Sequence, residues 1–490
     1  MRCLAFRKRL STINTGKDNG MKLRRIMLAA PKSGSGKTTI TCALLQALKD
    51  CGEQVISYKC GPDYIDPMFH RSVIGVPSKN LDTFFTGEEV TKELFLQDRT
   101  ENDFAVIEGV MGLYDGLGGV REEGSSYHLA VVTKTPIILV VDAKGMGRSI
   151  IPMIAGFLSY DKEHLIKGII LNRMSGMYYN TIKPLIEAEL PVKVVGYLPD
   201  QKAGMLASRH LGLVMPQEIP DLRASLKNLT KEFVKTVSID EIITFGDQVS
   251  DLNCKHTLFV KNKHTEVVLS CKKMEKPGEI ILAVARDEAF CFYYEDNLRM
   301  LENDGVTLRY FSPVHDKKLP DGCCGILLGG GYPELYADRL SQNQEILVQI
   351  RDAIAEGMPV VAECGGFMYL HESMTVESGE CFPMVGAIKA QCEYKGKLVR
   401  FGYIELEEQE PNFLPNGQKI RAHEFHYFDS TDNGSDCIAT KPVTGRTYPC
   451  VIDRDNVWLG YAHLYYPSNP EFAHAFVRKV CDYAKIEKYK

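Results

Sequence analysis

The chain carries the stretch IMLAAPKSGSGKTT at residues 26–39. An apolar run leads here into a loop rich in glycine and serine, and a helical pattern follows, which is the context that a phosphate-binding loop requires. Gly34 and Gly36 let backbone N–H groups approach phosphate oxygens without a Cβ in the way. Lys37 supplies a positive charge for the β- and γ-phosphates, the Thr38 hydroxyl can ligate Mg²⁺, and the helix N-terminus adds its positive dipole end. This stretch therefore predicts a nucleotide-binding α/β domain.

Pro31 stands where the plain GxxxxGK[ST] pattern has its first glycine. The loop thus resembles the variant KxGxGKTT form, in which an additional lysine, here Lys32, joins the phosphate site. The alternative is a flexible Gly/Ser turn before a helix, but the preceding strand and the following amphipathic helix favour the phosphate loop. We expect ATP to contact seven residues of the loop: Lys32, Gly34, Ser35, Gly36, Lys37, Thr38 and Thr39.

Outward from this loop, strand-like apolar runs alternate with helical stretches, which argues for βαβ units and a parallel sheet covered on both faces. The runs of the first half lie at residues 26–30, 54–58, 104–107, 136–142, 167–171 and 192–195. A second α/β pattern has apolar runs at 280–284, 325–328 and 359–362 and ends in a helix at about 471–483. The charged segment between the two patterns has one weakly strand-like run, at 266–269, and we interpret it as a helix followed by a linker.

The chain is therefore expected to have four segments. They are a basic N-terminal extension at 1–23, a P-loop domain at 24–222, a helix and linker at 223–278, and a second α/β domain at 279–490. No apolar stretch follows the basic residues of the extension, so we do not interpret it as a secretory signal.

The amino-acid composition excludes several classes of protein. Of 490 residues, 44% are hydrophobic and 25% are charged, as in a globular protein with more than one core. The formal net charge of −5 gives no field for holding nucleic acid or an anionic membrane. No apolar run approaches the roughly 18 residues of a membrane helix, and the 15 cysteines are too sparse for a disulfide scaffold. We expect a cytoplasmic protein without a nucleic-acid or membrane partner, and a homodimer is left open.

Two acids follow predicted strands at the carboxyl end of the first sheet, where α/β domains collect their ligands. Asp63 lies after the run at 54–58, and Glu108 ends the run at 104–107. Mg²⁺ usually takes one or two carboxylates together with phosphate oxygens and water. A lone acid in a loop is more often simply solvated, but the strand-end position and the glycine-rich surroundings favour metal ligands at both positions.

The second α/β pattern contains MPVVAECGGFMYL at residues 358–370. An apolar strand runs into Cys364 between small residues and a helix begins directly after it, which is typical of a nucleophile elbow. The turn exposes the sulfur, the helix N-terminus lowers the thiol pKa, and a thiolate could attack a carboxamide carbon. Backbone N–H groups of Gly365 and of the glycine turn at Gly330 are candidates for an oxyanion hole. A buried, inert thiol is the alternative for any cysteine, but only Cys364 has this frame.

Several further motifs carry a family resemblance. They are GPDYIDPMFH at 61–70, NLDTFF at 80–85, EGVMGLYDG at 108–116, SRHLGL at 208–213 and ARDEAFCFYY at 285–294. From about Arg25 to the C-terminus the chain is similar to the cobyrinic acid a,c-diamide synthase family. The resemblance implies an N-terminal domain like dethiobiotin synthetase, with Mg²⁺ near Thr38, Asp63 and Glu108. It also implies that Asn172 faces the nucleotide base and that the second domain is a triad-type glutamine amidotransferase.

Amidotransferase chemistry requires a base, and His463, in GYAHLYYP at 460–467, sits where the family places it. Many related glutaminases have Glu two residues later to orient the imidazole. Here that position is Tyr465, so the third member of the triad is unassigned. His423 and His426 could suggest a metal pair, but their spacing differs from that of the HExxH zinc motif and favours a structural motif near the active site.

Together the halves imply an ATP- and glutamine-dependent carbon–nitrogen ligase. ATP would convert a substrate carboxylate into an acyl phosphate, and ammonia from glutamine hydrolysis at Cys364 would then displace the phosphate. The family's substrate is cobyrinic acid, a tetrapyrrole of cobalamin biosynthesis that is amidated on its a and c acetate side chains. We place Tyr64 and Asp115 at its binding surface.

Other substrates and one other class remain open at this stage. Hydrogenobyrinic acid and Ni-sirohydrochlorin need the same two half-reactions. The alternative class is a P-loop regulatory ATPase with a non-catalytic, amidotransferase-like binding domain, which the missing Glu after His463 would favour and the elbow cysteine would not.

Overall fold

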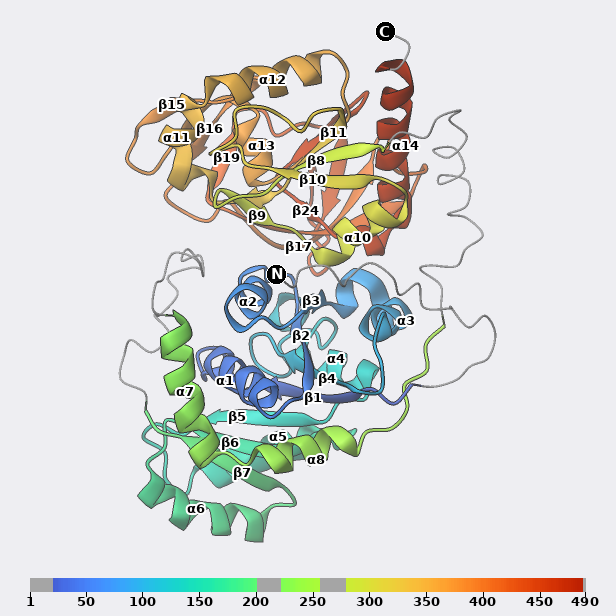
Figure 1. Ribbon diagram of the computed structural model, residues 1–490. Coiled ribbons are helices and arrows are strands. Elements are labelled where there is room, and N and C mark those ends of the chain that lie inside the picture. The colour runs from blue at the N-terminus through green and yellow to red at the C-terminus, as the bar shows by residue number, and fades with distance from the viewer. Residues whose placement is uncertain (1–20, 201–221, 256–278, 488–490) are drawn as a thin grey trace.

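The computed structural model describes residues 21–200, 222–255 and 279–487. The chain forms two α/β halves that lie one above the other in Figure 1, the first coloured blue to green and the second yellow to red. Three predictions fall outside the described residues: the basic extension up to residue 20, the SRHLGL motif, and the strand-like run at 266–269. Within the described ranges, no helix combines the length and the apolar character that crossing a bilayer would take.

The first half is built on a seven-stranded parallel sheet in the order β3-β2-β4-β1-β5-β6-β7. Its strands are β1 (Arg24–Ala29), β2 (Gln54–Cys60), β3 (Ser78–Leu81), β4 (Asp103–Glu108), β5 (Ile137–Asp142), β6 (Ile166–Asn172) and β7 (Lys193–Leu198). Ile26 and Leu28 of β1 pack into the core on one face of the sheet, and Met27 and Ala29 pack into the core on the other. Both faces are buried, as the uninterrupted apolar run predicts. The short strand β3 was not among the predicted strands.

Helices cover both faces of this sheet (Figure 1). They are α1 (Lys37–Asp50), α2 (Ile65–Phe69), α3 (Thr83–Leu96), α4 (Ser126–Thr133), α5 (Ile150–Tyr160), α6 (Gly176–Glu189), α7 (Leu222–Thr236) and α8 (Ile239–Asp247). The segment after residue 221 contains two helices, where the sequence predicts one. Leu229 and Phe233 of α7 enter the same core as Leu44 of α1, so α7 belongs to the first half.

The second half combines an α/β sheet with further sheets that are antiparallel or mixed. The α/β sheet has the order β10-β8-β11-β13-β23-β22, in which β22 runs antiparallel to β23 and the other pairs are parallel. Its strands are β8 (Ile281–Ala285), β10 (Thr307–Phe311), β11 (Cys323–Leu328), β13 (Val360–Glu363), β22 (Ile452–Arg454) and β23 (Val457–Gly460). Its helices are α10 (Glu295–Asn303), α11 (Ala337–Gln342), α12 (Gln344–Ala355), α13 (Gly365–Tyr369) and α14 (Pro470–Glu487).

Three further sheets complete the second half, and the sequence did not predict them. One pairs β9 (Phe290–Phe292) with β12 (Gly330–Gly331). A second contains β14 (His371–Thr375), β15 (Cys381–Pro383), β16 (Ile388–Tyr394) and β19 (Phe428–Ser430). The third contains β17 (Arg400–Glu408), β18 (Lys419–His426), β20 (Cys437–Thr440), β21 (Thr447–Cys450) and β24 (His463–Leu464). β12 and β24 matter most for function, because they carry a predicted oxyanion glycine and the predicted base.

The two halves meet through a polar and aromatic interface. The Lys79 ammonium at the β3 edge lies 2.8 Å from Oδ1 of Asp296 on α10, and both side chains are largely buried. The Tyr403 hydroxyl of β17 donates to Oδ2 of Asp82 at 2.5 Å. Aromatic rings around Phe85 fill the space between these polar pairs. These contacts hold β3 and the start of α3 against α10 and the antiparallel sheet that carries β24.

Candidate active site

The phosphate loop is held in shape from the end of β6. Nδ2 of Asn172 donates to the backbone oxygen of Ser35 at 2.8 Å, and Nη2 of Arg173 donates to that of Gly34 at 3.0 Å. Gly36 caps α1 with a φ of 91°, and a Cβ there would collide with the Asn172 amide, so glycine is required. The structure therefore places Asn172 on the backbone of the loop. Its contact with a nucleotide base stays a prediction.

Two lysines and a threonine of the loop differ in their surroundings. Lys37 is buried, and its ammonium donates to a backbone carbonyl of the loop after β4. Burial, together with the nearby Lys59 ammonium, lowers the pKa of Lys37 to about 8. A bound phosphate would oppose both effects, because an anion favours the charged ammonium. Lys32 is exposed at the start of the loop, and Thr39 is half-buried on the first turn of α1.

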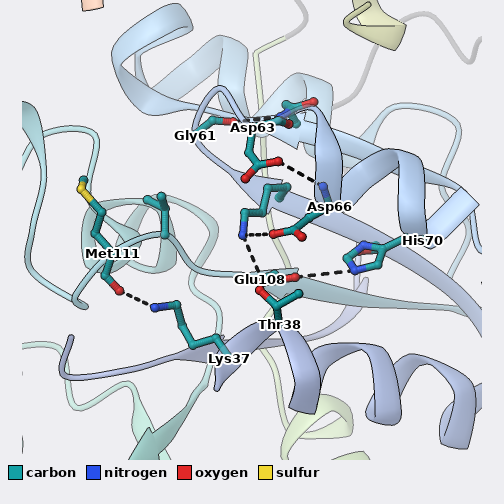
Figure 2. Close-up of polar contacts among 12 residues, drawn as sticks. Lys37, Thr38, Gly61, Asp63, Asp66, His70, Glu108 and Met111 are labelled. Carbon is teal, nitrogen blue, oxygen red and sulfur yellow. Dashed lines mark hydrogen bonds and ion pairs between the residues drawn. The ribbon is translucent and has the colours of Figure 1, made fainter. Parts of the chain in front are cut away.

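A buried carboxylate joins the phosphate loop to the neighbouring strands (Figure 2). Glu108, at the end of β4, accepts from Oγ1 of Thr38 at 2.6 Å and from the Lys59 ammonium at 3.0 Å. The same ammonium lies 2.6 Å from Oδ2 of Asp66, and Nε2 of His70 lies 3.6 Å from the second oxygen of Glu108. Burial, with the Asp66 charge, raises the pKa of Glu108 to about 7. The structure thus brings together two of the three residues expected near Mg²⁺, Thr38 and Glu108, and their role as metal ligands stays a prediction.

The carboxylate of Asp63, which was expected to ligate Mg²⁺, makes a backbone contact in this structure. Its Oδ1 accepts from the backbone N–H of Asp66 at 3.0 Å and so caps the first turn of α2. The carboxylate that reaches Glu108 through Lys59 is that of Asp66, which sequence reasoning did not single out although it lies in the same motif. Among the described residues, no group of three or more His, Cys, Asp or Glu side chains is arranged to hold a metal ion.

Cys364 forms a strained elbow between β13 and α13. Its φ and ψ are 48° and −104°, which a residue with a side chain rarely adopts, and its N–H continues the parallel ladder by donating to Gly460 at 2.8 Å. The glycines around it leave no room for side chains. A Cβ at Gly365 would lie 3.1 Å from the backbone nitrogen of Gly331, and one at Gly330 would collide with the ring of His463. The strand-turn-helix frame predicted for Cys364 is therefore present.

The electrostatic prediction for the thiol was wrong for this structure. We expected the helix N-terminus to lower the pKa of Cys364, but burial, with the charge of Glu334 next, raises it to about 12. Burial also lowers the pKa of His463 to about 3, and the neighbouring His423 and His426 lower it in the same direction. The cause is desolvation, which disfavours the charged form of each group, and the backbone N–H of Gly365 at the start of α13 opposes it only in part.

The histidine pair flanks the predicted base, as the interpretation of a structural motif near the active site requires. His423 faces His463 across the β18–β24 ladder. His426 hydrogen-bonds through Nδ1 to the backbone oxygen of Phe428 at 2.7 Å, and its ring stacks on Tyr461 with centroids 4.0 Å apart. Burial lowers the pKa of both histidines. Both imidazoles are therefore uncharged where they lie beside His463.

A cavity of about 1310 Å³ between the two halves contains both catalytic candidates of the second half. Cys364 and His463 line it from the second half, and Asp63 and Tyr64 line it from the first. Tyr64 stacks on Phe292 at 4.9 Å and lies 5.3 Å from the ring of His463, so the loop after β2 reaches the glutaminase candidate directly.

The second predicted substrate contact, Asp115, does not line this cavity. Its side chain is exposed, and Oδ2 accepts from the N–H of Gly112 at 2.9 Å, which makes it a turn-capping residue. The residues directly after it do line the cavity, from Gly116 to Gly119. The predicted loop is thus at the cavity, but Asp115 is not the residue that faces it.

Comparison with known proteins supports this architecture. Residues 26–213 match the family described as the CobQ/CobB/MinD/ParA nucleotide binding domain, and residues 281–471 match the CobB/CobQ-like glutamine amidotransferase domain. The two domains fit ATP and glutamine as substrates.

Three relatives, each named cobyrinate a,c-diamide synthase, match nearly the whole chain. The protein of Clostridium acetobutylicum is 38% identical over 93% of this chain and 100% of its own length. That of Caldanaerobacter subterraneus subsp. tengcongensis is 37% identical over 90% of this chain and 95% of its own length. That of Clostridium tetani is 36% identical over 93% and 100%. The P-loop and amidotransferase fold expected from the sequence is confirmed, and the chain belongs to the cobyrinate a,c-diamide synthase family.

Proposed function

We propose that the chain amidates the a and c acetate side chains of cobyrinic acid, using ATP to activate each carboxylate and glutamine as the nitrogen source. The observation that carries this proposal is the shared cavity. Cys364 and His463 open into the same space as the loops that follow β2 and β4 of the phosphate-binding half. Ammonia released at Cys364 would therefore enter a space that loops of the phosphate-binding half border.

The phosphate-binding half would make the carboxylate reactive. A carboxylate is a poor electrophile, because amide formation would have to expel oxide or hydroxide. Transfer of the γ-phosphoryl group of ATP to a carboxylate oxygen gives an acyl phosphate and ADP, and phosphate is a good leaving group. The protein's part is positioning and charge neutralisation. Lys37 and Lys32 would hold the phosphates together with the N–H groups of Gly34, Ser35 and Gly36.

Two residues, Thr38 on the first turn of α1 and Glu108 at the end of β4, fit Mg²⁺. The hydroxyl of Thr38 and the carboxylate of Glu108 are oxygen ligands of the kind that Mg²⁺ prefers, and Oε2 of Glu108 is buried without a hydrogen-bond partner. Burial alone would lower the pKa of Lys59, but Asp66, Glu108 and Asp63 raise it well above its ordinary value, so this pocket favours a cation. When bound, Mg²⁺ would neutralise charge on the transferring phosphoryl group. We retain Asp63 as its second carboxylate, and Asp66 is the competing candidate.

The second half would hydrolyse glutamine. His463 would take the proton of the Cys364 thiol, and the sulfur would attack the carboxamide carbon to form a thioester and release ammonia. Water then hydrolyses the thioester to glutamate. The N–H groups of Gly365 and of the β12 turn at Gly330 would stabilise the oxyanion. Ammonia attacks the acyl phosphate, phosphate leaves, and the side chain becomes an amide.

The cavity suits a large, partly apolar substrate. A volume of about 1310 Å³ exceeds what glutamine alone needs, and aromatic side chains such as Tyr64, Phe401 and Tyr427 line much of it. We propose that Tyr64 contacts the macrocycle. Hydrogenobyrinic acid and Ni-sirohydrochlorin offer similar carboxylate arms, but the relatives' name favours cobyrinic acid.

The regulatory ATPase is disfavoured by the elbow geometry. A binding module has no use for a strained cysteine that shares a cavity with a histidine. The decisive experiment incubates the protein with ATP, Mg²⁺, glutamine and each of the three macrocycles, and measures product mass. Two replacements of OH by NH₂ on cobyrinic acid are expected. In Cys364→Ala, ammonium chloride should still support amidation while glutamine does not. If neither nitrogen source gave an amide with any macrocycle, the proposal would be refuted.

A further inference from the structure

The imidazole of His463 has no orienting acid at the position where many related glutaminases have one. That position is Tyr465, whose hydroxyl donates to Oδ2 of Asp296 at 3.0 Å and whose ring stacks on Phe85. Tyr465 therefore belongs to the interface between the halves. Nδ1 of His463 is buried and has no hydrogen-bond partner. A general base with a free Nδ1 can rotate and can carry its proton on either nitrogen.

Glu363 is the acid that lies beside this nitrogen. Its Oε2 is 4.0 Å from Nδ1 of His463, and only 7% and 4% of the two side chains are exposed. Burial raises the pKa of Glu363 to about 8, and a hydrogen bond from the backbone N–H of Leu464, the residue after His463, opposes that rise. The remaining oxygen, Oε1, is buried without a partner.

The fold makes this arrangement a consequence of the elbow. Glu363 is the last residue of β13, directly before the nucleophile, and it pairs with Gly460 in the parallel ladder. Three residues after Gly460, the chain reaches His463. The same ladder that positions Cys364 therefore sets the distance between Glu363 and the imidazole.

We propose that Glu363 is the residue that positions and charge-stabilises His463, in place of the acid that is absent after it. The inference rests on the glutaminase proposed above. When Cys364 gives its proton to Nε2, the imidazolium carries a second proton on Nδ1. The positive charge of the imidazolium favours the ionised form of Glu363 and so opposes the effect of burial on its pKa. The carboxylate then accepts a hydrogen bond from Nδ1–H, fixes the ring and offsets its charge. The separation of 4.0 Å must shorten by about 1 Å in the complex, as catalytic hydrogen bonds often do.

The alternative is that Glu363 serves only the fold, by holding the Leu464 N–H. The two roles differ in what they predict for conservative variants. Glu363→Gln keeps the size and an acceptor for Leu464 but loses the charge. Glu363→Asp keeps the charge and shortens the side chain. A purely structural role favours Gln over Asp, and a positioning role favours Asp over Gln.

The test uses the full chain with ATP, Mg²⁺ and cobyrinic acid. Glu363→Gln should lower glutaminase kcat on the order of 10²–10⁴-fold, as loss of an orienting carboxylate does in a catalytic triad. The KM for glutamine should change by less than about threefold, because Glu363 would act after binding. Glu363→Asp should recover at least about tenfold of the lost kcat. Amidation with saturating ammonium should be unchanged in both variants.

A matched control is Glu408→Gln. Glu408 is another buried glutamate of the same half, it accepts from the backbone N–H groups of Asn412, Phe413 and Leu414, and it does not line the cavity. This variant should lower the unfolding temperature and leave glutaminase kcat unchanged. The inference is overturned if Glu363→Gln keeps kcat within threefold of the unaltered protein, or if Glu363→Asp is no better than Glu363→Gln. If the unaltered protein amidates nothing with either nitrogen source, the proposed function itself fails, which is a distinct result.

Discussion

The resting state of Cys364 gives the sharpest physical prediction. A thiol with a pKa of about 12 is ionised to about one part in 10⁴ at pH 8, whereas a free cysteine of pKa about 8.5 is ionised to about a quarter. Because the thiolate is the nucleophile, alkylation of Cys364 by iodoacetamide should be on the order of 10³-fold slower than that of an ordinary cysteine. The unliganded enzyme is thus expected to hold a protonated thiol beside a neutral imidazole.

The assay follows alkylation of the Cys364 peptide by mass spectrometry between pH 7 and pH 10. Cys381, which is exposed in the same half, is alkylated in the same sample and serves as the internal comparator. The Cys364 rate should rise about tenfold per pH unit throughout this range, because each unit increases the thiolate fraction tenfold below the pKa. Restricted access lowers the rate at every pH, but it does not change this slope.

A variant at Glu334 tests the cause of the raised Cys364 pKa. Glu334 contributes most to the raised pKa of Cys364 after burial, so Glu334→Gln should lower that pKa and increase the alkylation rate at pH 8. The reasoning would be refuted by a Cys364 rate that is flat from pH 7 upward and comparable with that of Cys381. Such a profile would mean that a thiolate–imidazolium pair already exists in the unliganded enzyme.

Three further predictions concern other parts of the molecule. Gly330→Ala should reduce glutaminase kcat by about 10²-fold or more while ammonia-dependent amidation persists, because the new Cβ would displace the ring of His463. Glu108→Gln should reduce amidation with either nitrogen source by about 10²-fold, measured as ADP and amide formation, because the Thr38 site loses its carboxylate. Lys79→Met should lower the free energy of unfolding by about 3 kcal/mol in thermal or urea unfolding, because it leaves the charge of Asp296 buried without its partner.

Most of the correct predictions came from patterns within a single short stretch of sequence. The phosphate loop and the elbow are each contained in a single stretch of strand, turn and helix, so the order of apolar, glycine and reactive residues specifies them. The spacing of Gly34, Gly36 and Lys37 needs no information from elsewhere in the chain. The same holds for Cys364 between its flanking glycines and alanine.

Predictions that depend on distant contacts were less complete. Thr38 and Glu108 are 70 positions apart in sequence, and Glu363 and His463 are 100 apart. Which acid meets which partner is decided by the parallel ladders and by the packing of the two halves, and this information is not local. The pKa of Cys364 was mispredicted for the same reason, since burial is a property of the assembled fold. The antiparallel and mixed sheets were not predicted, although β16, β17 and β18 span seven to nine residues, because these strands are partly exposed and have no uninterrupted apolar run.

Burial of the site between the two halves explains how the proposed reaction avoids losing ammonia to water. Ammonia released into water would be protonated and lost, so the cavity between the halves has to exclude water while glutamine is hydrolysed. The same exclusion raises the pKa of Cys364 and lowers that of His463, so both groups are neutral until a ligand changes their surroundings. The unliganded enzyme therefore holds almost no thiolate at Cys364. The burial that keeps the resting nucleophile protonated also raises the pKa of Glu363 to about 8. An imidazolium formed at His463 would favour ionisation of this carboxyl, which lies 4.0 Å away, so Glu363 is the group in reach that would favour proton transfer once glutamine is bound.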